Sequence, residues 1–130
     1  MTKVKVFLSF EFERDQGHYR RFFAEVAHGD SCHDIEDYSL NEPYKLHDNK
    51  WLKKAHEQIS RSDIVIVVIG EDTHNAPGVK KEVTITNQKP RPIFQIRPKD
   101  STGGAVSGAG DEIPWKWKKI DAKISKCLKK

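Results

Sequence analysis

The sequence predicts a single α/β domain in which helices cover both faces of a parallel β-sheet. Residues 64–69 form an unbroken run of isoleucine and valine, which is typical of a strand buried on both faces in the middle of a parallel sheet. A second run rich in β-formers, residues 4–10, begins almost at the N-terminus. Segments with helical spacing alternate with the strand-like runs, which is the pattern of parallel crossovers.

The segment after the first strand is predicted to be a helix from about Gln16 to His28, and Gly29 suits its end. Its apolar residues fall at helical spacing: Tyr19, Phe22, Phe23, Val26 and Ala27. A short strand, Ser31 to Ile35, is expected next, and the turn residues of 37–49 predict a loop.

A second helix is predicted from an N-cap at Asp48 or Asn49 to about Ser60. Its inner face is expected to contain Trp51, Leu52, Ala55 and Ile59. After the central strand, a third helix is predicted over roughly 78–87 and a fourth strand over 92–96.

Residues 99–113 are rich in glycine and offer little to bury, which predicts a flexible loop or a very short edge strand. Pro114 suits the first turn of a basic amphipathic helix over 114–130. Its apolar stripe consists of Trp117, Ile120, Ile124 and Leu128. The resulting element order predicts a flavodoxin-like, doubly wound sheet of four or five strands, in the order 2-1-3-4 with any fifth strand at the edge.

Length and composition narrow the class of protein. A chain of 130 residues suits one domain, 1–130, and can bury a single core. Cys32 and Cys127 are too few for a disulfide framework. No apolar stretch resembles a signal peptide or approaches the ~20 residues that span a bilayer, so we expect a cytoplasmic protein with no membrane partner.

The sequence lacks the common motifs that hold phosphates and metals. It contains no GxxxxGK[ST] loop and no GxGxxG after the first strand, and the late glycines lack a strand-turn-helix frame. The histidines and cysteines have no metal-ligand spacing. We therefore expect no metal site and no permanently bound cofactor.

The sequence fits a nucleic-acid-binding protein and a receiver-type phosphorylation domain only in part. The lysines between Lys116 and Lys130 could form a nucleic-acid face, but lysines on the outer face of a terminal helix are ordinary, so nucleic acid is not the expected partner. A receiver-type phosphorylation domain would carry an acidic pair after strand one, where this chain has Glu11, Glu13 and Asp15. It would also place an aspartate at the tip of strand three, whereas Asp72 comes several residues later.

In open parallel sheets, ligands bind beyond the carboxyl ends of the strands. The turn after the central strand and the helix that carries Glu82 therefore lie where a site is expected. An exposed helix carboxylate that pairs with neighbouring lysines is the ordinary alternative for Glu82.

Three segments together resemble the TIR-like domains of the Thoeris antiphage-defence type. VFLSFEFERD, residues 6–15, is similar to the family's opening strand, and DYSL, residues 37–40, is similar to its Asp-x-Ser loop. IVIVVIGEDTHNAPGVKKEV, residues 64–83, is similar to its strand, G-x-x-T turn and glutamate-bearing helix. The resemblance covers about residues 3–97.

That resemblance implies an NAD glycohydrolase or ADP-ribosyl cyclase, with NAD as substrate and Glu82 as the catalytic carboxylate. The matched positions that would line the same cleft are Ser9, Phe10, Asp37, Ser39, Gly70 and Thr73. The expected partners are NAD or an ADP-ribose-like nucleotide, and a second copy of the chain or another defence protein.

One position departs from the family pattern. The family often has tryptophan four residues before the glutamate, where this chain has Gly78 preceded by Pro77. An aromatic ring there would pack the helix start and fix the approach of the glutamate. A non-catalytic TIR-like or receiver-like module that works through protein contacts therefore stays open as the alternative.

Overall fold

The computed structural model describes residues 3–40, 42–45 and 47–129. Its five strands pair in parallel in the order β2-β1-β3-β4-β5, which confirms the predicted fold class. The elements in chain order are β1 (Val4–Ser9), α1 (Gln16–His28), β2 (Ile35–Asp37), α2 (Asn49–Arg61), β3 (Ile64–Val68), a 3-10 turn η1 (Thr73–Asn75), α3 (Pro77–Gln88), β4 (Ile93–Arg97), β5 (Glu112–Pro114) and α4 (Trp117–Leu128). None of the described helices is long and apolar enough to cross a membrane.

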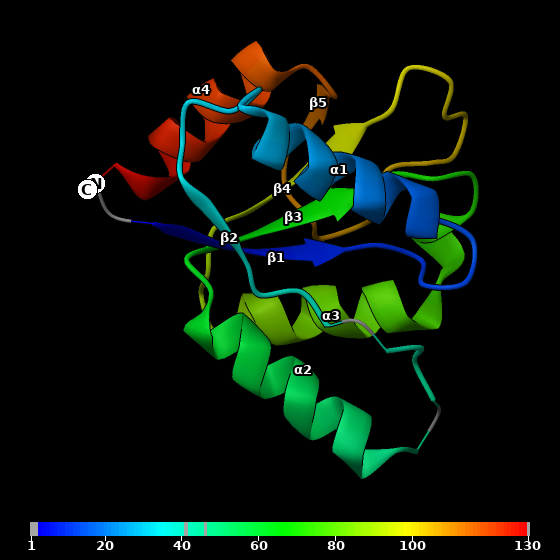
Figure 1. Cartoon of the computed structure of the whole chain (residues 1–130). Helices are drawn as coiled ribbons and strands as arrows, with labels where there is room; N and C mark the ends of the chain where they lie inside the picture. The colour runs from blue at the N-terminus through cyan, green and yellow to red at the C-terminus, as the bar shows by residue number, and fades with distance from the viewer. Residues whose placement is uncertain (1–2, 41, 46, 130) are drawn as a thin grey trace.

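Helices cover both faces of the sheet, with α1 and α4 on one face and α2 and α3 on the other (Figure 1). Because successive side chains of a strand point to opposite faces, β3 contributes to both layers. Ile64, Ile66 and Val68 pack with the α1–α4 layer, whereas Val65 and Val67 pack toward α2 and α3. All five side chains are fully buried, as expected of a central parallel strand.

The helix ends follow the predicted signals. Asp48 is the N-cap of α2, and its carboxylate accepts from the backbone N–H groups of Lys50 and Trp51. Gly29 ends α1 with a φ of 94°, a left-handed conformation that glycine adopts without steric cost.

Two predicted boundaries are wrong. The strand expected at Ser31–Ile35 begins only at Ile35. The Ser31 hydroxyl and the Cys32 N–H donate to the Asp121 carboxylate on α4, so these two residues do not pair with β1. Pro114 does not start the last helix. It ends the edge strand β5, where a missing N–H costs little, and α4 begins at Trp117.

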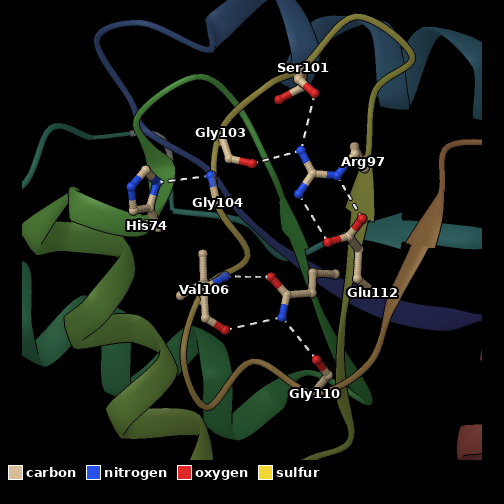
Figure 2. Close-up of polar contacts among 9 residues, drawn as sticks. His74, Arg97, Ser101, Gly103, Gly104, Val106, Gly110 and Glu112 are labelled. Atoms are coloured by element: carbon tan, nitrogen blue, oxygen red, sulfur yellow. Dashed lines mark hydrogen bonds and ion pairs between the residues drawn. The ribbon is translucent and has the colours of Figure 1, made fainter.

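The glycine-rich segment 99–111 is anchored to β4 (Figure 2). The Gln95 amide donates to the carbonyls of Val106 and Gly110 and accepts from the Val106 N–H at 2.8 Å. Arg97 donates to the carbonyls of Ser101 and Gly103 and pairs with Glu112 of β5 through two hydrogen bonds. Val106 and Ala109 are buried against β3 and α3, so the expectation that this segment has little to bury is wrong.

Candidate functional site

Glu82 lies on the buried face of α3 and points toward the end of β1. Val79, Val83 and Thr86 are buried on the same helix, so helical spacing places Glu82 among them. Glu82 is 7% exposed, and the hydroxyl of the fully buried Ser9 donates to its Oε1 at 2.7 Å.

The surroundings of Glu82 favour its neutral form. Burial raises the pKa of the Glu82 carboxyl from 4.5 to about 8, and the Ser9 hydrogen bond opposes that rise. The carboxyl therefore holds a proton at pH 7 when nothing else occupies the site. Perturbed carboxyls of this kind are typical of functional sites.

Glu82 lines a cavity of about 220 Å³ at the carboxyl end of β1. Aromatic side chains supply much of the wall: Phe10 and Phe12 after β1, Tyr44 from the loop before α2, and Trp51 from α2. Tyr44 and Trp51 stack edge to face, with their ring centroids 4.8 Å apart. The first turn of α3, including Gly78, also lines the cavity.

The lining is acidic. Among the described lining residues, four are glutamates, namely Glu11, Glu13, Glu42 and Glu82, and none is lysine or arginine. Lys54 offsets one of them through an ion pair with Glu42, and the N-terminus of α3 adds a partial positive charge. Burial also raises the pKa of Glu11, whose acidic neighbours add to the rise, while Arg14 opposes it. Glu82 is neutral at pH 7, Glu42 pairs with Lys54, and Glu11 Oε1 lies 3.9 Å from Arg14 Nε. The exposed Glu13 is therefore the main source of negative charge among the described lining residues, and it favours a cation.

Two buried polar atoms of this lining have no hydrogen-bond partner within the described part of the chain. One is the acceptor Glu11 Oε1, and the other is the donor Nε1 of Trp51, a side chain that is 2% exposed. Because an unpaired buried polar group costs about 1–3 kcal/mol, the cavity suits a ligand that can both accept from the indole and donate to the carboxylate.

Asp37 and Ser39 lie at β2 and do not line this cavity. The Tyr19 hydroxyl donates to Asp37, whose carboxylate also accepts from the Ser39 N–H at 2.8 Å. The Ser39 hydroxyl accepts from the Leu8 N–H at 2.9 Å. These contacts fix the chain as it leaves β2.

Gly70 and Thr73 form a second buried group apart from the cavity lining. The Thr73 hydroxyl accepts from the Gly70 N–H at 2.7 Å and donates to Asp15 at 3.1 Å. A Cβ at Gly70 would lie 2.1 Å from the Asp15 carboxylate, so only glycine allows this approach. Thus, of the seven residues predicted for the site, the structure brings together Glu82, Phe10 and, through its bond to Glu82, Ser9.

Sequence reasoning did not assign five of the lining residues to the site, namely Tyr44, Trp51 and the glutamates at 11, 13 and 42. The one signal in the sequence was Gly78, at the position where the family often has tryptophan. In the structure, a Cβ at this position would lie 2.8 Å from Tyr44 Cβ. The absent side chain thus leaves room for an aromatic residue from the loop. The helix α3 begins at Pro77, in the first turn where proline is favoured.

The model of the family described as Thoeris protein ThsB, TIR-like domain, matches residues 7–103, which is most of the chain. The chain belongs to this family. It is a defence-associated TIR-like protein, and the match includes the end of β1, the cavity-lining segments and α3 with Glu82.

Among solved structures, the chain is similar to a 3-dehydroquinate dehydratase-like protein from Bifidobacterium longum, with a TM-score of 0.50 and 14% identity. The alignment covers 98% of this chain and 96% of the other. At this identity the likeness concerns the flavodoxin-like fold alone. No curated protein matches the chain.

Proposed function

We propose that this TIR-like protein cleaves the bond between nicotinamide and ribose in NAD, with Glu82 as the catalytic carboxylate. The single observation that carries the proposal is the position of Glu82, a buried carboxyl at the edge of an acidic, aromatic cavity. Membership of the family supplies the context of antiphage defence.

The nicotinamide end of NAD matches the cavity in three respects. Its pyridinium ring is cationic, which suits an acidic lining and the faces of Phe10, Tyr44 and Trp51. Its carboxamide can accept from the Trp51 indole and donate to Glu11, the two atoms that lack partners. A cavity of about 220 Å³ is below the ~300–1,000 Å³ of sites that enclose drug-sized ligands, so the ADP portion would lie outside it.

Entry of the cation would also prepare Glu82 for catalysis. A positive charge near a carboxyl lowers its pKa, so the proton that Glu82 holds in the empty site is released as the pyridinium binds. The glycosidic C–N bond then breaks, nicotinamide leaves with the bonding electrons, and the ribose becomes oxocarbenium-like. The ionised Glu82 stabilises that cation.

The fate of the ribose depends on what attacks its C1′ carbon. Attack by water gives ADP-ribose, with the water proton passing to solvent or to a base. Attack by a nucleophile within ADP-ribose gives a cyclic messenger. Self-association or a partner defence protein is the expected trigger of activity.

The test is product analysis after purified protein is incubated with NAD, with and without an extract of infected cells as trigger. We expect the wild type to release nicotinamide and Glu82→Gln to lose about 10²–10³ in rate, the effect of removing one electrostatic stabiliser. Glu57→Gln is the matched control, since Glu57 is exposed on α2 and does not line the cavity. Equal release by wild type and Glu82→Gln would show the assignment to be wrong.

The second candidate is a non-catalytic module that works through protein contacts. The observation that favours it is the closed pairing of Glu82 with Ser9, in which a protonated carboxyl serves as part of the core. This candidate predicts no Glu82-dependent nicotinamide release under any trigger.

A further inference from the structure

A second cluster of reactive side chains lies away from the cavity, between the turn before β2 and α4. Cys32, His33 and Asp121 each offer one ligand atom, and these three atoms lie within 4.8 Å of one another. Cys32 is exposed, and the other two are half-buried, so the cluster is open to ions from solvent. No part of the proposed NAD chemistry uses these residues.

We propose that Cys32, His33 and Asp121 form a site for a divalent transition metal of the zinc class. Thiolate, imidazole and carboxylate are the ligands that Zn²⁺ takes in proteins, and three of them with water complete a tetrahedral set. Bond lengths of about 2.0–2.3 Å place tetrahedral ligand atoms about 3.5 Å apart, so closing this cluster on an ion moves its atoms by about 1 Å.

The neighbours of the cluster hold its ligands as metal sites require. The Ser31 hydroxyl and the Cys32 N–H donate to the two oxygens of Asp121 at 2.6 and 2.9 Å, which fixes the carboxylate. His33 Nε2 lies 3.2 Å from the Asp121 carbonyl and 3.1 Å from the Ser125 hydroxyl. Because the carbonyl can only accept, a neutral ring that bonds to it carries its hydrogen on Nε2 and keeps the lone pair on Nδ1. Such an N–H to carbonyl bond is the usual support of a metal-binding histidine.

The Cys32 thiol has a proton for a metal to replace. The thiol lies beside the Asp121 carboxylate, which accepts from the Cys32 N–H at 2.9 Å. A divalent cation between the two groups takes the place of that proton, with the thiol proton released to solvent. The bound ion would tie the turn before β2 to α4 and thereby brace the β2 edge of the sheet.

The test uses the untagged full chain with reduced thiols, titrated with Co²⁺ as a spectroscopic substitute for Zn²⁺. We expect thiolate-to-metal charge-transfer absorption at one equivalent, its displacement by Zn²⁺, and a rise in melting temperature with Zn²⁺ that a chelator reverses. Cys32→Ser should abolish the absorption, and Asp121→Asn should weaken binding at least tenfold. Cys127→Ser, which changes the other cysteine of the chain on helix α4, should leave both unchanged.

The outcomes are decisive in either direction. Absence of charge-transfer absorption in the wild type would overturn the proposal, as would its persistence in Cys32→Ser. Equal loss in Cys127→Ser would also overturn it, because the metal would then bind elsewhere. The melting temperature of each metal-free variant separates loss of ligation from loss of fold.

Discussion

The burial of Glu82 predicts a pH-dependent cost to stability that one substitution removes. The carboxyl loses its proton near pH 4.5 in the unfolded chain but keeps it to about pH 8 in the fold. Between these values the unfolded state binds fewer protons, so wild-type stability falls as pH rises. At 1.36 kcal/mol for each pH unit, the loss is about 3 kcal/mol by pH 7 and about 5 kcal/mol above pH 8.

Glu82→Gln replaces the carboxyl by a neutral group of the same shape whose oxygen can still accept from Ser9. The variant and the wild type should be equally stable near pH 4.5, and the variant should be the more stable by several kcal/mol at pH 8. Urea denaturation at pH 5, 6, 7 and 8 measures the difference. Glu57→Gln, at an exposed position, should follow the wild type at every pH.

A constant difference between Glu82→Gln and the wild type across this range would refute the reasoning. It would mean that Glu82 titrates alike in the folded and unfolded chains, and therefore that water reaches it freely. The effect is large enough to detect, since a domain of this kind has a total stability of about 5–15 kcal/mol.

Two further predictions concern the ligand and the glycine-rich segment. Nicotinamide riboside, a cation without phosphate, should compete with NAD in a binding titration better than ADP-ribose does. The nicotinic acid analogue of the riboside should bind about tenfold more weakly than the riboside, because its carboxylate would face Glu11. Tighter binding of ADP-ribose or of the nicotinic acid analogue than of nicotinamide riboside would contradict an acidic site. Gly103→Ala should destabilise the protein by about 3 kcal/mol in urea denaturation, because its Cβ would lie 2.0 Å from the Gly70 carbonyl oxygen. Gly104→Ala is the matched control, since its Cβ would meet the His74 ring at an ordinary 3.4 Å, and equal costs would count against this packing.

The fold could be predicted because its determinants are local. The valine and isoleucine run of β3, the helical spacing of α1 and the N-cap at Asp48 each carry their signal within a few residues. The predictions from sequence failed where contacts between residues far apart in the chain determine the local structure. Ser31 and Cys32 do not form part of β2, because they donate hydrogen bonds to Asp121, which lies far along the chain. Likewise the glycine-rich segment packs because Gln95 and Arg97 supply its hydrogen bonds.

The site could be predicted only in part, for a similar reason. The order of strands and helices places the helix of Glu82 at the carboxyl edge of the sheet, whereas Phe10 was assigned through the family resemblance. Tyr44 and Trp51 reach the cavity from the loop and helix after β2, and no periodic pattern shows where that loop folds. Thr73 is a matched motif position whose hydroxyl instead fixes the turn after β3 through Gly70 and Asp15.

The most direct test of the account is a crystal structure of Glu82→Gln with NAD, in which the slowed reaction keeps the substrate intact. We predict that the nicotinamide ring lies among Phe10, Tyr44 and Trp51, with its carboxamide bonded to the Trp51 indole and the ribose C1′ beside residue 82. A nicotinamide ring bound outside this cavity, with residue 82 still paired to Ser9 alone, would contradict the account.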